Sequence, residues 1–502
     1  MTKHKYLPVL WFLLGFGIFM LSRASSVIPF IIPRGMAMII APIFILGFIR
    51  SQTTKRGILL TLLGFLLSFN IALWGLFDDG DEFSMMLFSL VRSSVLAILF
   101  LFPYIMDRVV YPKFKERGLL STFTFPIIAT ATFFLISLEG PFDGDAIFAV
   151  FGYGHRYFKQ IASLGGLWGF VFIFSWFASA INYSWEQKFN WGKIKNVTFI
   201  FSFVILIILL FGAIKTSSLI RPEADTVKIA SIILLPEKGK VVDSEGLLSK
   251  VPSPFEEVLS HIETLTKKAV SHHAKIVTFQ ETAIKIREDN EKKLINRLQE
   301  IAKELDIYFS VSYGVYPEEG KGWNKHVLMN NQGGIEIEYR KRYLFGLGDL
   351  FGETLLYKKG PEVIQTTDTP YGRIGIAICR DMSFPAYIRQ AGKNNVDIML
   401  GPSYDFPRST SHLYALRAIE NGFSFIRPTY NGISFAVDYT GKILAEMDSD
   451  NTEHGIMYTE VPTKGVTTLY SRIGDLLGWL CVAGFVAVIV ISIQDRLHKR
   501  HN

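Results

Sequence analysis

The chain has 502 residues, 49% of them hydrophobic and 42 of them phenylalanine, with a formal net charge of +7. Long apolar blocks fill the first 215 residues and a normally polar stretch follows, which excludes a single ordinary soluble domain. The basic excess lies beside the apolar blocks, so it does not indicate nucleic acid as a partner. Two cysteines, Cys379 and Cys481, cannot form a disulfide framework.

The apolar blocks predict membrane-spanning helices, because a helix needs about 20 mostly apolar residues to cross the hydrocarbon core. The candidate spans are Tyr6–Leu21, Ile32–Ile49, Gly57–Phe77, Met85–Met106, Leu119–Leu138, Gly165–Tyr183, Val197–Ile214 and Ile473–Ile493. We therefore predict a membrane domain of about seven transmembrane helices over residues 1–215. Residues 468–502 are predicted to form a C-terminal transmembrane helix and a cytoplasmic tail.

The basic residues between these spans predict their orientation, because cytoplasmic loops are enriched in lysine and arginine. Every second loop is basic, through Lys3, Lys5, Lys55, Arg56, Arg108, Lys113, Lys115, Arg117, Lys188, Lys193, Lys195, Arg496, Lys499 and Arg500. This pattern predicts a multi-pass protein of the inner or plasma membrane with both termini in the cytoplasm. Residues 216–467 are then expected to form an extracytoplasmic domain.

From Asp225 the sequence alternates between predicted strands and helices, which favours a layered α/β domain. The helix that starts near "SPFEEVLSHIETL" is predicted to have a capping box between Ser253 and Glu256. A strand pair is predicted around Asn431 and Gly432.

Three residues that can carry chemistry follow predicted strands. Glu281 follows "AKIVTF", Lys341 follows "IEIEYR" and Cys379 ends "RIGIAI". Each alone has an ordinary structural explanation, as a turn residue, part of a solvated charge run or a packing residue. The carboxyl ends of strands are where α/β sheets collect functional groups, so the three together predict one site.

The segments "VTFQETAI", "EYRKRYLFGLGD" and "GIAICRD" resemble the Glu-Lys-Cys triad of the carbon–nitrogen hydrolase (nitrilase) superfamily. With its flanking spans and the stretch "LGGLWGFVFIFSWFASAINY", the whole chain resembles a divergent member of the apolipoprotein N-acyltransferase family. The resemblance implies an α-β-β-α sandwich for the outward domain and an acyltransferase activity.

The resemblance also implies substrates. A phospholipid would donate an acyl chain to Cys379 as a thioester, in a ping-pong reaction. The N-terminal amine of a lipid-modified cysteine in an apolipoprotein would accept the chain. In this chemistry Glu281 is the base for the thiol and the amine, and Lys341 stabilises the oxyanion. A monomer without a cofactor is expected, and His261, His272 and His273 lack a carboxylate at ligand spacing for a metal.

Four other polar residues are expected to support the triad or position substrate. Asp349 stands where we expect the family's second glutamate, in a segment aligned with its Pro-Phe-Gly-Glu. Arg380 and Asp381 replace the usual Tyr-Glu after the cysteine, and Asp405 lies in "PSYDFP". Arg380 is expected either to contact a phospholipid phosphate or to form an ion pair with Asp381 or Asp405.

The apolar, glycine-containing loop after Lys341 is expected to be either an ordinary packed loop or a lid that dips into lipid. Its candidate lid residues are Phe345, Leu347, Leu350 and Phe351.

Two other functions stay open from the residues alone. One is a membrane-anchored amidase or nitrilase-type hydrolase that uses the same triad and transfers the acyl group to water. The other is a non-catalytic binding module, disfavoured because all three triad residues are intact and no intramembrane charge pattern suggests a transport pathway.

Overall fold

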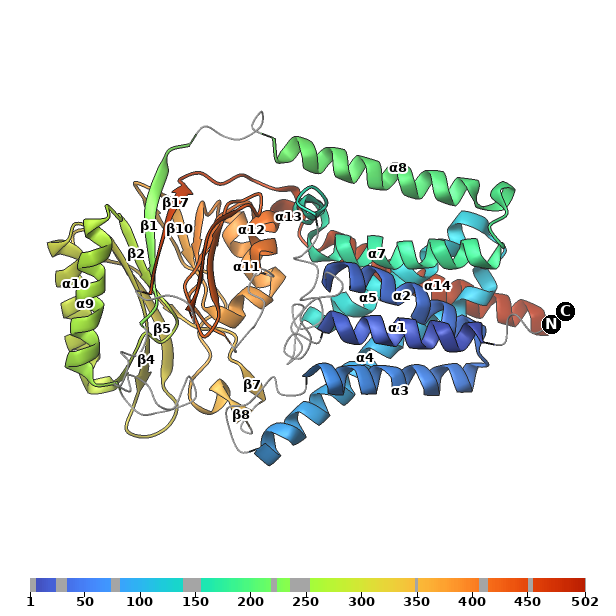
Figure 1. The fold of residues 1–502 in the computed structure, drawn as a ribbon, viewed down its shortest axis with the longest axis horizontal. Coiled ribbons are helices and arrows are strands. Elements are labelled where there is room, and N and C mark those ends of the chain that lie inside the picture. The colour runs from blue at the N-terminus through green and yellow to red at the C-terminus, as the bar shows by residue number, and fades with distance from the viewer. Residues whose placement is uncertain are drawn as a thin grey trace. The chain divides into compact units, whose positions relative to one another are not determined.

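A computed structural model describes residues 6–23, 34–73, 82–138, 155–217, 224–234, 253–347, 351–405, 414–449 and 455–501. The chain divides into two compact units (Figure 1). The membrane unit contains Met1–Glu139, Ile147–Ile214 and Asp475–Asn502, and the sandwich unit contains Lys215–Gly474 together with Gly140–Ala146.

The membrane unit is a bundle of long helices (Figure 1). They are α1 Leu7–Arg23, α2 Arg34–Ser51, α3 Thr54–Leu73, α4 Glu82–Phe114, α5 Thr124–Leu138, α7 Ala162–Glu186, α8 Trp191–Lys215 and α14 Leu476–His501. Each predicted span corresponds to one of them. Within the described residues, 6 helical segments are long and apolar enough to cross a membrane, while Leu7–Leu21 and Ile39–Ser51 are shorter apolar helices. The helices therefore indicate an integral membrane protein.

Aromatic side chains fill the interior of this bundle. Phe16 and Phe19 of α1 meet Phe65 of α3 edge to face, with ring centroids 5.1 and 5.2 Å apart. The outer surface is also apolar: Phe199 and Phe203 of α8 are 63% and 61% exposed. A helix that is apolar on all sides and exposes such residues is suited to a lipid environment.

An ion pair that no sequence motif predicts is buried among the membrane helices. Arg50 of α2 donates two hydrogen bonds to Asp107 of α4, at 2.8 and 2.9 Å. The Arg50 guanidinium lies 3.4 Å from the centre of the Tyr111 ring and 3.7 Å from Glu186 of α7. Both charges stand just beyond the predicted spans, and α4 continues past Asp107 to Phe114, so the pair becomes part of the packed bundle.

The sandwich unit has two mixed sheets. In the first, β17 Ile456–Pro462, β1 Thr226–Ile232, β2 Ile276–Phe279, β4 Tyr308–Tyr316, β5 Trp323–Met329 and β6 Ile335–Arg340 lie in that order, with β3 Ile284–Arg287 on β4. In the second, the order is β16 Ile443–Asp448, β15 Ile433–Val437, β13 Ser424–Arg427, β11 Ile398–Leu400, β10 Gly372–Ile376 and β9 Thr366–Thr369. Two short pairs are β7 Gly346–Leu347 with β8 Phe351–Gly352, and β12 Ser403–Tyr404 with β14 Thr429–Tyr430.

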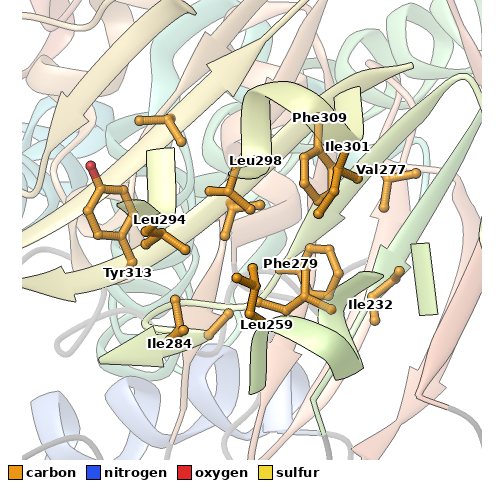
Figure 2. Packing of buried hydrophobic residues seen from close by; sticks show 14 of the residues in the cluster. Ile232, Leu259, Val277, Phe279, Ile284, Leu294, Leu298, Ile301, Phe309 and Tyr313 are labelled. Carbon is orange, nitrogen blue, oxygen red and sulfur yellow. The ribbon is translucent and has the colours of Figure 1, made fainter. Parts of the chain in front are cut away.

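Hydrophobic clusters define four layers. Helices α9 Phe255–Ser271 and α10 Glu291–Glu304 cover the first sheet, and Figure 2 shows Leu294 and Leu298 of α10 in one cluster with Phe279, Phe309 and Tyr313 of the strands. Ile229, Ile276, Ile376 and other aliphatic residues of both sheets pack face to face. Helices α11 Pro385–Lys393 and α12 Ala415–Asn421 cover the second sheet. The predicted α-β-β-α sandwich is confirmed, and truncating a buried leucine such as Leu298 should cost about 2–5 kcal/mol.

Two local predictions met different outcomes. The strand pair is confirmed, because β13 and β15 run antiparallel and Asn431 between them has a φ of 61°. The capping box is wrong: α9 begins at Phe255 and the side chain of Ser253 accepts a hydrogen bond from the Lys285 backbone at 3.0 Å. Ser253 lies one residue before the N-cap position of α9, so its side chain does not cap the helix. Its hydrogen bond with Lys285 connects the start of α9 to β3.

Candidate active site

The structure brings Glu281, Lys341 and Cys379 to one place in the sandwich unit. Lys341 directly follows β6, and its Nζ donates to Glu281 Oε1 at 2.7 Å. The Glu281 and Lys341 side chains are 0% and 1% exposed, whereas Cys379 is half-buried. The backbone of Tyr404 connects the base to the nucleophile: its N–H donates to Glu281 Oε2 at 2.9 Å, and its carbonyl accepts from Cys379 Sγ at 3.8 Å.

The backbone is strained at both ends of this connection. Cys379 has a φ of 45° and Thr282, immediately after Glu281, has a φ of 47°. Left-handed backbone at residues other than glycine costs about 1–3 kcal/mol each and persists where the surroundings impose it. Here the Cys379 N–H donates to Pro402 O at 2.8 Å, and a 3₁₀ turn, Cys379–Ser383, starts at the cysteine. The lone thiol therefore stands on a sharp turn after β10.

A second glutamate, Glu353, completes the polar centre. Lys341 Nζ donates to its two carboxylate oxygens at 2.8 and 2.7 Å, and Glu353 is fully buried. Asp349, to which we assigned this role, lies outside the described residues. The signal for Glu353 was in the sequence, since Phe351-Gly352-Glu353 fits the family's Phe-Gly-Glu better than the segment that ends at Asp349.

Asn324 of β5 also belongs to the centre, although no sequence motif pointed to it. Its side-chain amide donates to Glu281 Oε1 at 2.7 Å and to Glu353 Oε1 at 3.3 Å. Its backbone carbonyl accepts from the Lys341 N–H at 2.9 Å. One side chain on β5 thus orients both carboxylates that bind Lys341.

Asp381 joins the lysine segment to the nucleophile turn. Its carboxylate accepts from the backbone N–H groups of Arg342, Tyr343 and Ile378 at 3.1, 2.7 and 3.0 Å. The Tyr339 hydroxyl adds a bond of 2.6 Å. Burial raises the pKa of Asp381 to about 6, opposed by these hydrogen bonds. Asp381 therefore fixes the segments that carry Lys341 and Cys379 relative to each other.

Asp405 pairs with Arg427, whose Nη2 lies 2.7 Å from Asp405 Oδ1, and Asp381 is bound by Tyr339 and backbone groups. An ion pair of Arg380 with either aspartate stays a prediction. The Arg380 guanidinium lies 5.8 Å from the centre of the Phe345 ring. Contact with a phospholipid phosphate stays a prediction for Arg380.

The described ends of the expected lid are attached to the polar centre. The Phe345 N–H donates to Glu353 Oε2 at 2.7 Å, and Leu347 pairs with Phe351 in the β7–β8 ladder. Gly352 has a φ of 89°, and a Cβ there would lie 2.6 Å from the Phe345 carbonyl oxygen, so the turn requires glycine. Leu350 lies outside the described residues.

Burial and charge set the protonation of the triad. Burial raises the pKa of Glu281 to about 7, with Lys341 opposing the shift and Glu353 adding to it. Burial also raises the pKa of the Cys379 thiol to about 12, and nearby Glu281 adds to that effect. Burial lowers the pKa of Lys341, but the two glutamates outweigh it and keep the ammonium charged. At neutral pH the site thus holds a thiol, a cation and a carboxylate able to take a proton.

Comparison with known proteins defines the class. Residues 246–470 match the family described as Carbon-nitrogen hydrolase. The match covers most of the sandwich unit, and Glu281, Lys341 and Cys379 lie within the matched residues.

The similar curated proteins include acyltransferases and amidases. An apolipoprotein N-acyltransferase of Haemophilus ducreyi is 23% identical over 446 residues, which are 81% of this chain and 83% of the relative. That of Geobacter metallireducens is 25% identical over 49% of this chain, a match that spans 51% of the relative's length. A deaminated glutathione amidase of Dictyostelium discoideum is 27% identical over 37% of this chain and 70% of its own length. Among solved structures, an amidase from Nesterenkonia sp. matches 52% of this chain and 98% of its own, with 18% identity and a TM-score of 0.42.

Proposed function

We propose that the protein is a phospholipid-dependent N-acyltransferase that acylates the N-terminal amine of a lipid-modified cysteine in apolipoproteins. The observation that carries the proposal is a half-buried thiol on a strained turn, beside a lysine bound by two buried glutamates. The similarity to the Haemophilus protein supports it, because 446 aligned residues are more than the sandwich unit alone contains.

In the first half-reaction, Cys379 Sγ attacks the ester carbonyl carbon of a phospholipid while Glu281 accepts the thiol proton. Lys341 stabilises the negative charge on the carbonyl oxygen. When the ester C–O bond breaks, Glu281 returns the proton to the departing lysophospholipid oxygen. The acyl chain is then held as a thioester on Cys379.

In the second half-reaction, the amine of the acceptor attacks the thioester carbonyl and gives one proton to Glu281. The C–S bond breaks, the amide is released, and the proton returns to Cys379.

Both substrates are lipids, so the site needs access to a bilayer. We propose that the charge pattern of the loops places the sandwich unit outside the cytoplasm, that the β7–β8 loop acts as the lid, and that the protein works as a monomer.

The test is the intact mass of the full-length protein in detergent after incubation with phospholipid. We expect an adduct of one acyl chain on the wild type that hydroxylamine removes, with an equimolar amount of lysophospholipid released. The matched Cys379→Ala protein should carry no adduct. An unmodified wild-type protein that still folds and still presents a reactive thiol would contradict the proposal.

The second candidate is a hydrolase, favoured by the similarity to amidases over the triad-bearing region. It predicts turnover of small amides without a lasting lipid adduct. Supplying a diacylated lipopeptide to the acylated protein separates the two functions. A transferase moves the chain to the peptide amine, whereas a hydrolase releases free acid at a rate that the peptide does not change.

A further inference from the structure

A buried arginine outside the triad, Arg427, stands at the end of β13. Its side chain is 0% exposed. Within the described part of the chain, its Nε and Nη1 atoms and Asp405 Oδ2 are buried without a hydrogen-bond partner. Unpaired buried donors on a cation are costly, so a residue of this kind calls for a specific reason.

The hydrogen bonds of the Arg427 guanidinium go to Ser403 of β12 and to Asp405, which directly follows that strand. Its Nη2 atom donates to Ser403 Oγ at 2.6 Å and to Asp405 Oδ1 at 2.7 Å. Ser403 Oγ donates in turn to Asp405 Oδ1 at 2.9 Å. The guanidinium also lies 4.2 Å from the centre of the Tyr414 ring, which covers one of its faces. Arg427 therefore binds Ser403 and Asp405, the residues on either side of Tyr404.

Tyr404 is the residue whose backbone joins the two reacting groups. Its N–H binds Glu281 at 2.9 Å, its carbonyl accepts from the Cys379 thiol at 3.8 Å, and the preceding Pro402 carbonyl accepts from the Cys379 N–H at 2.8 Å. Strand β12 has two residues and pairs with the two residues of β14. So short a pairing stabilises the position of β12 only weakly.

We propose that Arg427, through Ser403 and Asp405, clamps β12 and so positions Glu281 and Cys379 for proton transfer. Arg427 is a positioning residue, because its guanidinium hydrogen bonds go to Ser403 and Asp405. A guanidinium suits the task because its planar fork fixes direction as well as charge, and because it stays ionised when buried. The charged groups that act on the thiol are Glu281, Lys341, Asp405 and Arg427, so losing the clamp also changes the balance of charge around Cys379.

The test is the pH dependence of Cys379 alkylation by iodoacetamide in the full-length protein, followed by the mass of the Cys379 peptide. This reaction needs no acyl donor, so it stands apart from the proposed function. Arg427→Gln should lower the alkylation rate at pH 7.5 about tenfold and move the profile about one unit to higher pH. Arg427→Lys, which keeps the charge but loses the fork, should fall between Arg427→Gln and the wild type.

The control is Arg373→Gln. Arg373 binds Asp368 through two nitrogens at 2.8 and 2.9 Å near the start of β10, the end away from Cys379. Its alkylation profile should match the wild type. If Arg427→Gln does not fold, Ser403→Ala, which removes one contact of the clamp, should lower the rate about threefold.

A wild-type profile in folded Arg427→Gln, or in Ser403→Ala should the first not fold, overturns the clamp. In the same proteins, phospholipid acylation should fall in maximal rate with little change in the half-saturating lipid concentration. A shifted alkylation profile without any phospholipid adduct in the wild type would keep the clamp and reject the acyltransferase.

Discussion

Each unit buries a cluster of opposite charges around one cation, Arg50 in the membrane unit and Lys341 in the sandwich unit, and these two clusters are built differently. In the membrane unit, Arg50 presents two nitrogens to the two oxygens of Asp107. In the sandwich unit, the single ammonium of Lys341 is shared between Glu281 and Glu353. The first cluster balances two carboxylates, Asp107 and Glu186, with two cations, Arg50 and Lys115, and it links α2 to α4 and α7. The second has an excess carboxylate, so one acid keeps a pKa near neutrality and can exchange a proton.

The strongest test of this difference between the two clusters is to remove the cation of each, Lys341 in one and Arg50 in the other. Lys341→Met removes the oxyanion donor and leaves two buried carboxylates without a cation, so the rate of acyl-enzyme formation should fall about 10³-fold. Single-turnover acylation, followed by intact mass, measures the loss. Arg50→Met is the counterpart and should leave the acylation rate per folded molecule within about twofold. A Lys341→Met rate close to that of the wild type would show that the lysine is structural.

The anion of the membrane cluster should matter for folding alone. Asp107→Asn leaves the Arg50 charge buried without its carboxylate, and breaking a buried pair this way costs about 3–5 kcal/mol. Thermal unfolding in detergent should show the loss, while the surviving folded protein forms the Cys379 adduct at the normal rate. Equal stability of the variant and the wild type would mean that Glu186 compensates for Asp107.

The second acid of the site can be identified by a matched pair of variants. Glu353→Gln should reduce acylation about 10- to 100-fold, because Lys341 loses one of its two anionic partners and the Phe345 N–H loses its charged acceptor. Asp349→Asn, four residues earlier in the same loop, should reduce it less than about twofold. A reversed order would restore Asp349 to the role that we first gave it.

The two clusters also show which features of the structure can be predicted from the sequence and which cannot. The apolar helices and the alternation of strands and helices follow from length and periodicity. The four-layer sandwich and the three triad residues follow from the resemblance of the local motifs, so these features were predictable. Asn324 and Arg427 were not, because each acts through a partner that lies far away in sequence and near only in the folded sheets. The Arg50–Asp107 pair was hidden for the same reason. Glu353 could also have been predicted as a second acid, since Phe351-Gly352-Glu353 can be read directly in the loop, while the role of Asp349 stays a prediction.

The pH dependence of acylation tests the excess carboxylate directly. Glu281 must be ionised to accept the thiol proton, and its pKa is raised to about 7, so the rate should fall about tenfold per unit as pH drops below 7. Buried His326 is not the source, because burial lowers its pKa to about 3.

Asp381 should modify the same profile at lower pH. Its pKa is raised to about 6, so below pH 6 it also takes up a proton and its hold on the Lys341 segment weakens. The acid limb should therefore steepen there, and Asp381→Asn should abolish the steepening while the limb near pH 7 remains. Acylation rates from pH 5 to pH 9 in the two proteins measure both effects. A wild-type limb centred near pH 4.5 would mean that Lys341 fully offsets the effect of burial on Glu281, and the contrast between the clusters would vanish.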